Sequence, residues 1–258
     1  MFNWNSKFGY WWEFLIAMTK KEIKARYKMA IFGFLWIFLN PLLQMMVMGF
    51  IFQFFVPIKI VNYFEFLFLG LLAWNYFSYT VIKNTPMYIN ERALIQKAKF
   101  PREAIVLSVV LSNLFHFLIS LAIFVLFEWL FNSKIYWWRL LLLPEVILWL
   151  TVLTSGLSFL FSSLNVKWRD INFGVQVIMP LWFYATPIVY SLNLLPDWLS
   201  DWLYLNPMTA IVEMLRWIIM GIEVSWWKLG LSLVMTIIIF VSGCLVFKKE
   251  SPFFDDWV

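Results

Sequence analysis

The chain has 258 residues, of which 63% are hydrophobic, 21% are aromatic and only 14% are charged. Soluble domains carry about 25% charged residues, so this composition excludes a water-soluble globular protein and indicates one that folds in a lipid bilayer. The net charge of +5 is typical of a membrane protein in which Lys and Arg set the orientation. Because no basic tract is interleaved with aromatic residues, we expect no binding to nucleic acid.

The N-terminal segment predicts a helix that lies on the membrane surface. Residues 10–28, "YWWEFLIAMTKKEIKARYK", are amphipathic, with lysines opposite an apolar face. Basic amphipathic helices are attracted to anionic lipid and lie in the interface. The predicted apolar face consists of Trp12, Leu15, Ile16, Ile23 and Tyr27, and the predicted charged face of Lys20, Lys21, Lys24 and Lys28.

Six apolar segments are long enough to cross a bilayer, for which a helix needs about 20 residues. Lipid cannot satisfy free backbone groups, so continuous apolar segments of this kind form helices. They also differ from the short alternating segments of a β-barrel. The sequence therefore predicts an all-α integral membrane protein, one domain over 1–258, with transmembrane helices at 30–56, 63–83, 104–131, 140–164, 171–190 and 229–247.

The distribution of Lys and Arg predicts which helix ends face the cytoplasm. The N-terminal segment holds six of these residues and the 83–104 loop holds five. The loop after the fourth helix and the tail hold two each, whereas the opposite side holds five in all. Positive charge accumulates on the cytoplasmic side of membrane proteins. We therefore expect both termini and the 83–104 loop in the cytoplasm.

One loop contains a polar stretch, residues 90–104, "NERALIQKAKFPREA", with six charged residues. The sequence predicts a short helix over 88–99 and a hinge at Pro101, because proline fixes φ and interrupts a helix. A solvated, positively charged loop would not need the apolar Leu94, Ile95 and Phe100 that lie among the charges. We therefore favour a region over 88–103 that docks on a partner, which we call the docking segment.

Residues 187–228 form a second unusual segment, which is apolar but interrupted by Pro187, Pro196 and Pro207. A seventh span over 208–222 would be too short to cross a bilayer. The segment instead predicts short helices that re-enter the outer leaflet, where irregular backbone is covered by protein.

Residues that carry catalytic or metal chemistry are scarce. No Gly-rich loop ending in Gly-Lys-Ser or Gly-Lys-Thr is present, so the chain does not bind ATP by that route. The single histidine, His116, lies in the third span. It has no second ligand nearby in sequence, which favours a packed histidine with a hydroxyl partner over a metal site or a proton relay. Glu65, Glu128 and Glu145 fall near outer helix ends, where we expect them to reach water.

Aromatic and hydrogen-bonding side chains are concentrated in three of the spans. Flat rings beside amides and hydroxyls suit sugar rings that slide along a channel. They suit helix–helix hydrogen bonds and interfacial aromatic belts as well, so both interpretations remain open. The set consists of Trp36, Asn40 and Gln44 in the first span, Trp74, Asn75, Tyr76 and Tyr79 in the second, and Trp182, Tyr184 and Thr186 in the fifth.

Three motifs together resemble one family. "NERALIQKAKFPREA" is similar to the cytoplasmic loop of ABC-2 type permeases that export polysaccharide, and "NVKWRDIN" (165–172) resembles their short Arg-Asp loop. "PLWFYATPIVYSLNLLPDWL", followed by "YLNPMTAIVEMLRWIIMG", resembles their outer re-entrant segment. The resemblance covers nearly the whole chain in order and points to the permease subunit of an O-antigen-type polysaccharide ABC transporter.

The resemblance implies a homodimer with two separate cytoplasmic ATPase subunits, and a polyprenyl-linked polysaccharide as substrate. It implies no catalytic residue, metal or cofactor on this chain, because ATP and Mg²⁺ bind to the ATPase. The aromatic and polar set would line the channel. Arg26 and Lys28 would meet the lipid diphosphate, although anchoring to membrane lipids explains these two equally well. The implied ATPase-coupling residues are Glu91, Arg92, Leu94, Lys97, Lys99, Phe100, Pro101, Arg102, Glu103, Arg169 and Asp170.

The leading hypothesis is a channel subunit of an ATP-driven exporter that moves O-antigen-type polysaccharide from the cytoplasm across the inner membrane. Exporters of teichoic acid or capsule share much of this pattern, and an ABC-2 exporter of small amphipathic drugs is the alternative within transport. A membrane enzyme that acts on polyprenyl-linked sugars and a structural scaffold are the alternatives from other classes.

Overall fold

The computed structural model describes residues 4–27, 33–55, 60–97, 100–131 and 136–257. Within these ranges the regular structure is helical throughout, without strands, which confirms the predicted all-α class. Five helical stretches are long and apolar enough to cross a membrane. These are α2 (Trp36–Phe55), α3 (Tyr63–Asn84), α6 (Glu103–Phe131), the pair α7 (Trp137–Leu140) and α8 (Leu143–Lys167), and α12 (Trp226–Glu250) with its extension to Phe253.

The predicted fifth span is helical only over α9 (Asp170–Tyr184), and the chain turns at residues 185–190. Fifteen residues make a helix of about 22 Å, shorter than the hydrocarbon core of about 30 Å. The helix ends here because Pro187 cannot continue it and disfavours helical backbone at the residue before it. The prediction of one continuous helix over 171–190 was therefore wrong over its last six residues, 185–190.

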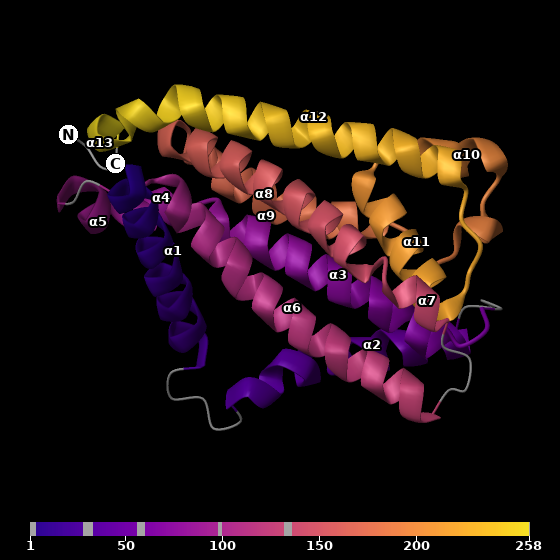
Figure 1. Ribbon diagram of the computed structural model, residues 1–258. Coiled ribbons are helices and arrows are strands. Elements are labelled where there is room, and N and C mark those ends of the chain that lie inside the picture. The colour runs from indigo at the N-terminus through magenta and orange to yellow at the C-terminus, as the bar shows by residue number, and fades with distance from the viewer. Residues whose placement is uncertain (1–3, 28–32, 56–59, 98–99, 132–135, 258) are drawn as a thin grey trace.

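The long helices form one bundle around α3 (Figure 1), which is the most buried of the five stretches and contacts α2, α6, α8, α9 and α11. α2 is the least buried. The two ends of the chain lie at the same end of the bundle, together with α4 and α5.

The closest helix contact lies between α8 and α12, which run side by side in Figure 1. A Cβ atom added to Gly243 would lie 2.1 Å from the carbonyl oxygen of Gly156, and one added to Gly156 would lie 2.6 Å from Cα of Phe240. Only glycine allows the two backbones to approach this closely, and small residues are a common device for packing helices in membranes.

The predicted surface helix is present as α1 (Trp4–Tyr27), which crosses the end of the bundle obliquely and packs on α6 (Figure 1). Its buried side chains are Leu15, Met18 and Glu22. Trp12 and Ile16 are exposed, so the predicted apolar face was only partly right. Exposed apolar side chains such as Trp12 and Ile16 therefore lie off the face that packs on α6.

The docking segment folds as two short helices, α4 (Met87–Asn90) and α5 (Arg92–Lys97), instead of the single predicted helix over 88–99. The break is at Glu91, whose backbone adopts φ −96° and ψ 24°. Its carboxylate accepts from Nζ of Lys21 in α1 at 2.7 Å. Local sequence favours one helix, and this contact with a distant part of the chain accompanies the interruption.

The outer segment consists of short pieces, as its prolines predict. α10 (Asp197–Leu203) begins directly after Pro196, and α11 (Pro207–Met220) begins at Pro207. Oδ1 of Asn206 caps α11 by accepting from the backbone N–H of Met208 at 3.1 Å. α11 ends at Gly221, whose φ of +79° favours glycine. The remaining turns are η1 (Gly33–Leu35), η2 (Leu192–Leu194), η3 (Ser251–Phe253) and the terminal α13 (Phe254–Trp257).

Candidate functional site

A cavity of about 370 Å³ lies where the end of α1 meets α2, α3 and α6. Six of the ten predicted channel-lining residues border it, together with Arg26, which the sequence placed in a different group. Its walls combine amides, hydroxyls and aromatic rings, and its other lining residues are mostly apolar. The lining residues are Arg26, Trp36, Ile37, Asn40, Pro41, Gln44, Leu72, Asn75, Tyr76, Tyr79, Asn113, His116, Phe117 and Ser120.

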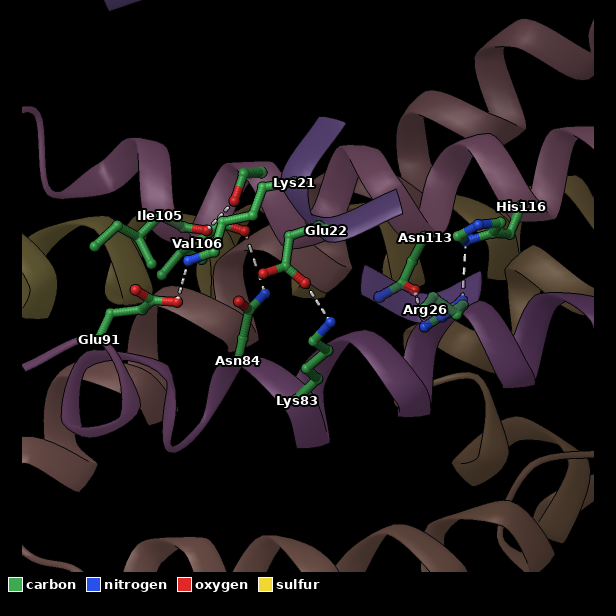
Figure 2. A network of polar contacts seen from close by, with 11 residues as sticks. Lys21, Glu22, Arg26, Lys83, Asn84, Glu91, Ile105, Val106, Asn113 and His116 are labelled. Atoms are coloured by element: carbon green, nitrogen blue, oxygen red, sulfur yellow. Dashed lines mark hydrogen bonds and ion pairs between the residues drawn. The ribbon is translucent and has the colours of Figure 1, made fainter. Parts of the chain in front are cut away.

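Arg26 forms the cationic corner of this cavity (Figure 2). Its Nη2 donates to Oδ1 of Asn113 at 2.6 Å, and its Nη1 lies 2.9 Å from Nδ1 of His116. The guanidinium carbon also lies 5.1 Å from the centre of the Tyr79 ring, within the range of a cation–π interaction. The guanidinium is therefore held in one orientation by α3 and α6 while it remains at the cavity wall.

His116 is buried, as the prediction of a packed histidine expected, and the partner of its Nδ1 is a guanidinium and not a hydroxyl. Arginine can only donate, so Nδ1 of His116 accepts and the ring proton of a neutral imidazole is on Nε2. Local sequence could not show this contact, since Arg26 and His116 belong to helices that are 90 residues apart in the chain.

A row of amides continues from this corner along α2 and α3. Nδ2 of Asn75 donates to Oε1 of Gln44 at 2.8 Å, and Nε2 of Gln44 lies 3.4 Å from Oδ1 of Asn40. Trp36 and Tyr79 lie at the same cavity, and Tyr79 is 58% exposed. Amides that donate and accept, beside exposed ring faces, suit a polyhydroxylated ligand such as a sugar, and the guanidinium suits a phosphate.

The other four predicted channel residues lie away from this cavity. Trp74 is buried and contacts the rings of Phe77 and Phe183. Asn206 accepts from Nε1 of Trp182 at 3.0 Å and donates to Oγ1 of Thr186 at 2.9 Å. Tyr184 is exposed at the end of α9. The contacts of Trp182 and Thr186 join α9 to the start of α11. These two residues therefore match the interpretation as helix–helix hydrogen bonds, which the sequence left open beside channel lining.

Three polar cavity residues were not predicted as a site: Asn113, His116 and Ser120, all on α6. Their spacing of three and four residues places them on one face of a helix. The spacing is visible in the sequence and predicts a polar stripe in an otherwise apolar span.

α1 connects this cavity to the docking segment through a series of contacts along its length (Figure 2). Glu22, which is buried, pairs with Lys83 of α3, and Lys21 pairs with Glu91. Near the other end of α1, Nε1 of Trp11 donates to Oε1 of Glu103 at 3.0 Å. Glu91 and Glu103, two of the predicted coupling residues, are therefore engaged within the chain.

The remaining predicted coupling residues divide into exposed and packed positions. Phe100 stacks on Phe14 of α1 with ring centres 5.0 Å apart. The carbonyl of Arg102 accepts from the hydroxyl of Tyr88 at 3.1 Å, and burial raises the pKa of Tyr88 well above its ordinary value, so this hydroxyl stays protonated. The structure places Leu94 and Pro101 as partly buried and Arg92, Arg169 and Asp170 as exposed; Lys28, Lys99 and the side chain of Lys97 lie outside the described residues.

The outer segment is held by a buried arginine, Arg216 of α11, which is 0% exposed. Its guanidinium donates to the carbonyl oxygens of Phe66, Pro187 and Ile188 and to Oε1 of Glu213, at 2.6 to 3.3 Å. These bonds join the start of α3 to the turn after α9. Near the outer helix ends, Glu128 is buried rather than water-accessible as predicted, whereas Glu65 is partly buried and Glu145 is exposed.

An all-helical bundle with several helices long and apolar enough to span a membrane indicates a multi-pass membrane protein, here with a polar, aromatic-lined cavity between its helices. The family model described as ABC-2 type transporter matches residues 13–220, and the chain belongs to this family. Such a chain is a transport subunit and not itself an enzyme.

Proteins similar to this chain carry a consistent name. An "O-antigen export system permease protein RfbA" from Klebsiella pneumoniae is 30% identical over 241 residues, which are 93% of each chain. A second Klebsiella pneumoniae protein of that name is 31% identical over 244 residues, again 93% of each chain. The protein of that name from Myxococcus xanthus is 35% identical over 202 residues, which are 77% of this chain and 76% of the relative.

Proposed function

We propose that this chain is the transmembrane subunit of an ATP-driven exporter that carries lipid-linked polysaccharide of the O-antigen type out of the cytoplasm. The family and the names of the similar permeases support this proposal. The working unit contains two copies of this chain in the cytoplasmic (inner) membrane and two ATPase subunits, which bind ATP and Mg²⁺. The exposed apolar faces of α2 and α9 offer surfaces on which a second copy can pack.

The observation that carries the proposal is the composition of the 370 Å³ cavity. Sugar rings present apolar faces and hydroxyl edges, so they bind to aromatic faces beside amides, as Tyr79, Asn75 and Gln44 provide. Few of these contacts are charged, which keeps binding weak enough for a polymer to move on. Arg26 at the cytoplasmic end of α2 and α3 is placed to contact the diphosphate that links glycan and lipid.

The proposed topology has six membrane segments, with α9 and the turn after it as the fifth. Both termini and the docking segment face the cytoplasm, which the Lys and Arg distribution supports. The short helices α10 and α11 re-enter the outer leaflet and close the outer end of the pathway. The network around Arg216 supports this arrangement, because it satisfies the backbone carbonyls that the turn after α9 leaves unpaired.

Coupling to the ATPase is assigned to the exposed part of the docking segment and to the α8–α9 junction. Arg92, Arg169 and Asp170 are exposed there. ATPase closure would move α4 and α5, and the contacts from Glu91 and Glu103 to α1 would carry the movement to Arg26 at the cavity. Charge reversal at Arg92 is expected to abolish transport while the chain still inserts in the membrane.

The test is reconstitution in proteoliposomes with the ATPase subunit of the same exporter. We expect ATP-dependent movement of polyprenyl-linked polysaccharide, lost on Tyr79→Ala or Arg26→Ala and retained on Lys24→Ala, an exposed position on the same helix as Arg26. Teichoic acid, capsule polymer or amphipathic drugs carried in its place would correct the substrate. Turnover of polyprenyl-linked sugars by the chain alone would contradict the proposal and favour a membrane enzyme. No movement of any of these would favour a scaffold.

A further inference from the structure

The segment after α12, residues 251–257, is anchored by one buried ring. Phe254 is 0% exposed, and its ring lies 4.5 Å from that of Tyr88 in α4 and 6.2 Å from that of Phe247. The guanidinium carbon of Arg102 lies 5.9 Å from the same ring. Phe254 therefore contacts both ends of the docking segment: Tyr88 at its start, in α4, and Arg102 near its end, just after Pro101.

The length of α12 places this segment beyond the lipid. The helix has 25 residues, about 37 Å, and begins at the outer aromatic residues Trp226 and Trp227. The hydrocarbon core is about 30 Å thick, so the helix leaves it near Lys248 and Lys249. Residues 251–257 follow on the cytoplasmic side, and Figure 1 shows α13 at the same end of the molecule as α4 and α5.

Two other rings of this segment are exposed and unusually placed for a water-facing surface. Phe253 and Trp257 stack on each other at 5.7 Å and are 49% and 38% exposed. Nζ of Lys167, in the last turn of α8, lies 5.4 Å from the Trp257 ring and 4.8 Å from the ring of Trp168. We call Trp168, Phe253 and Trp257 the aromatic patch.

The aromatic patch is continuous with the residues assigned to ATPase coupling. α13 contacts α5 on one side and α8 on the other, so it lies between the docking segment and the junction that carries Arg169 and Asp170. Lys167 contacts the patch, and the neighbouring elements carry further exposed cations: Arg92 on α5, Arg169 at the junction, and Lys248 and Lys249 at the end of α12.

We infer that residues 251–257 form a third part of the ATPase-docking surface, with Phe254 as the anchor and the aromatic patch as the contact. The inference rests on the proposed function. The partner that fits is the soluble ATPase subunit, presenting an apolar pocket for Phe253 and Trp257 with carboxylates around it that face the surrounding Lys and Arg. Aromatic rings in such pockets account for much of the binding energy of protein interfaces.

The test measures the affinity of the full-length chain, in detergent, for the ATPase subunit of the same exporter. The double variant Phe253→Ala/Trp257→Ala leaves the Phe254 anchor in place and should bind at least about tenfold more weakly. Trp198→Ala/Trp202→Ala, an exposed pair on α10 at the opposite end, is the matched control and should bind normally. Phe254→Ala should also weaken binding and should speed hydrogen exchange of the amides of α4 and α5.

Each outcome decides the inference. A change of less than about twofold for the double variant, with normal binding by the unsubstituted chain, would overturn it and leave the proposed function intact. Absence of binding by the unsubstituted chain would contradict the proposed function itself. In vesicles with brominated lipid, Trp257→Phe should not alter the quenched fraction of fluorescence. A marked loss of quenching would instead show that Trp257 anchors the chain in the inner leaflet and would overturn the inference.

Discussion

The Nη1 atom of Arg26 lies 2.9 Å from Nδ1 of His116, so the last turn of α1 is joined to the middle of α6 at the wall of the cavity. This contact brings a residue of α1 into the same site as the amides of α2 and α3. It also leaves the guanidinium with limited freedom, because Asn113 and Tyr79 contact it as well.

The first prediction concerns the shape of this cation. Arg26→Lys keeps the charge but loses the planar fork that reaches Asn113 and His116 together. We expect export of lipid-linked polysaccharide in proteoliposomes to fall by about tenfold, the effect of roughly 1.4 kcal/mol. Lys24→Arg is the control and should leave the rate unchanged. Equal rates for Arg26→Lys and the unsubstituted chain would show that only charge matters at this position.

The second prediction separates the ring of Tyr79 from its hydroxyl. The ring contacts the guanidinium and is exposed to the cavity, so Tyr79→Phe should retain most of the export rate. Tyr79→Ala removes the stacking surface and should lower the rate by about five- to tenfold, as loss of an aromatic contact of about 1 kcal/mol or more predicts. The reverse order, with Phe as impaired as Ala, would assign the role to the hydroxyl.

The third prediction compares the two ion pairs of α1. Lys83→Ala leaves the buried carboxylate of Glu22 without its cation, and we expect a loss of about 2–3 kcal/mol in stability. Lys21→Ala removes an exposed pair with Glu91, which should cost less than about 1 kcal/mol. Melting temperatures of the purified protein in detergent measure both. Adding Glu22→Gln to Lys83→Ala should restore part of the loss, and failure to do so would reject the buried-charge explanation.

The fourth prediction uses two glycines of the same helix. Gly243→Ala would place Cβ 2.1 Å from the carbonyl oxygen of Gly156, so α8 and α12 must separate, at a cost of about 1–3 kcal/mol. Gly230→Ala meets nothing within 4 Å and should be neutral or stabilising by up to about 1 kcal/mol, because alanine is the better helix former. Melting temperatures that shift equally for both variants would rule out the close contact.

The fifth prediction concerns the buried outer network. Arg216→Met removes the donor shared by Phe66, Pro187 and Ile188 and leaves Glu213 as a buried unpaired carboxyl, which should destabilise the protein by about 3–5 kcal/mol. Adding Glu213→Gln should recover a measurable part of the melting temperature. An Arg216→Met variant as stable as the unsubstituted chain would contradict the role given to this side chain.

The positions of the long helices were predictable from the sequence, because a span has a length requirement and a composition that few other structures share. Predicted and observed ends differ mainly where charged or aromatic residues such as Lys167 and Trp226 continue a helix past the apolar core. The breaks at Glu91 and Tyr184 were missed: the first coincides with an ion pair to the distant α1, and the second follows from the effect of Pro187 on the preceding turn.

Part of the cavity lining was also predictable, from the spacing of polar residues along a helix and not from the length of a span. Asn40 and Gln44, or Asn75 and Tyr79, share a helix face by spacing alone, and neighbouring spans were expected to bring such faces together. The contribution of Asn113 and His116 depends on the crossing of α1 over α6, which no local pattern contains. The same limit applies to Phe254, whose partners Tyr88 and Arg102 lie in a distant loop.

The contacts of Arg216 also set an order for membrane insertion. Every oxygen that accepts from its guanidinium belongs to an earlier residue, namely Phe66, Pro187, Ile188 or Glu213. A ribosome therefore completes the acceptors before it adds the cation, whose insertion into a bilayer would otherwise cost about 2.5–3.5 kcal/mol. When α11 leaves the translocon, the carbonyl oxygens that accept from Arg216 are already in the membrane. In a chain that has misplaced α3 or the turn after α9, the charge of Arg216 would lack these acceptors.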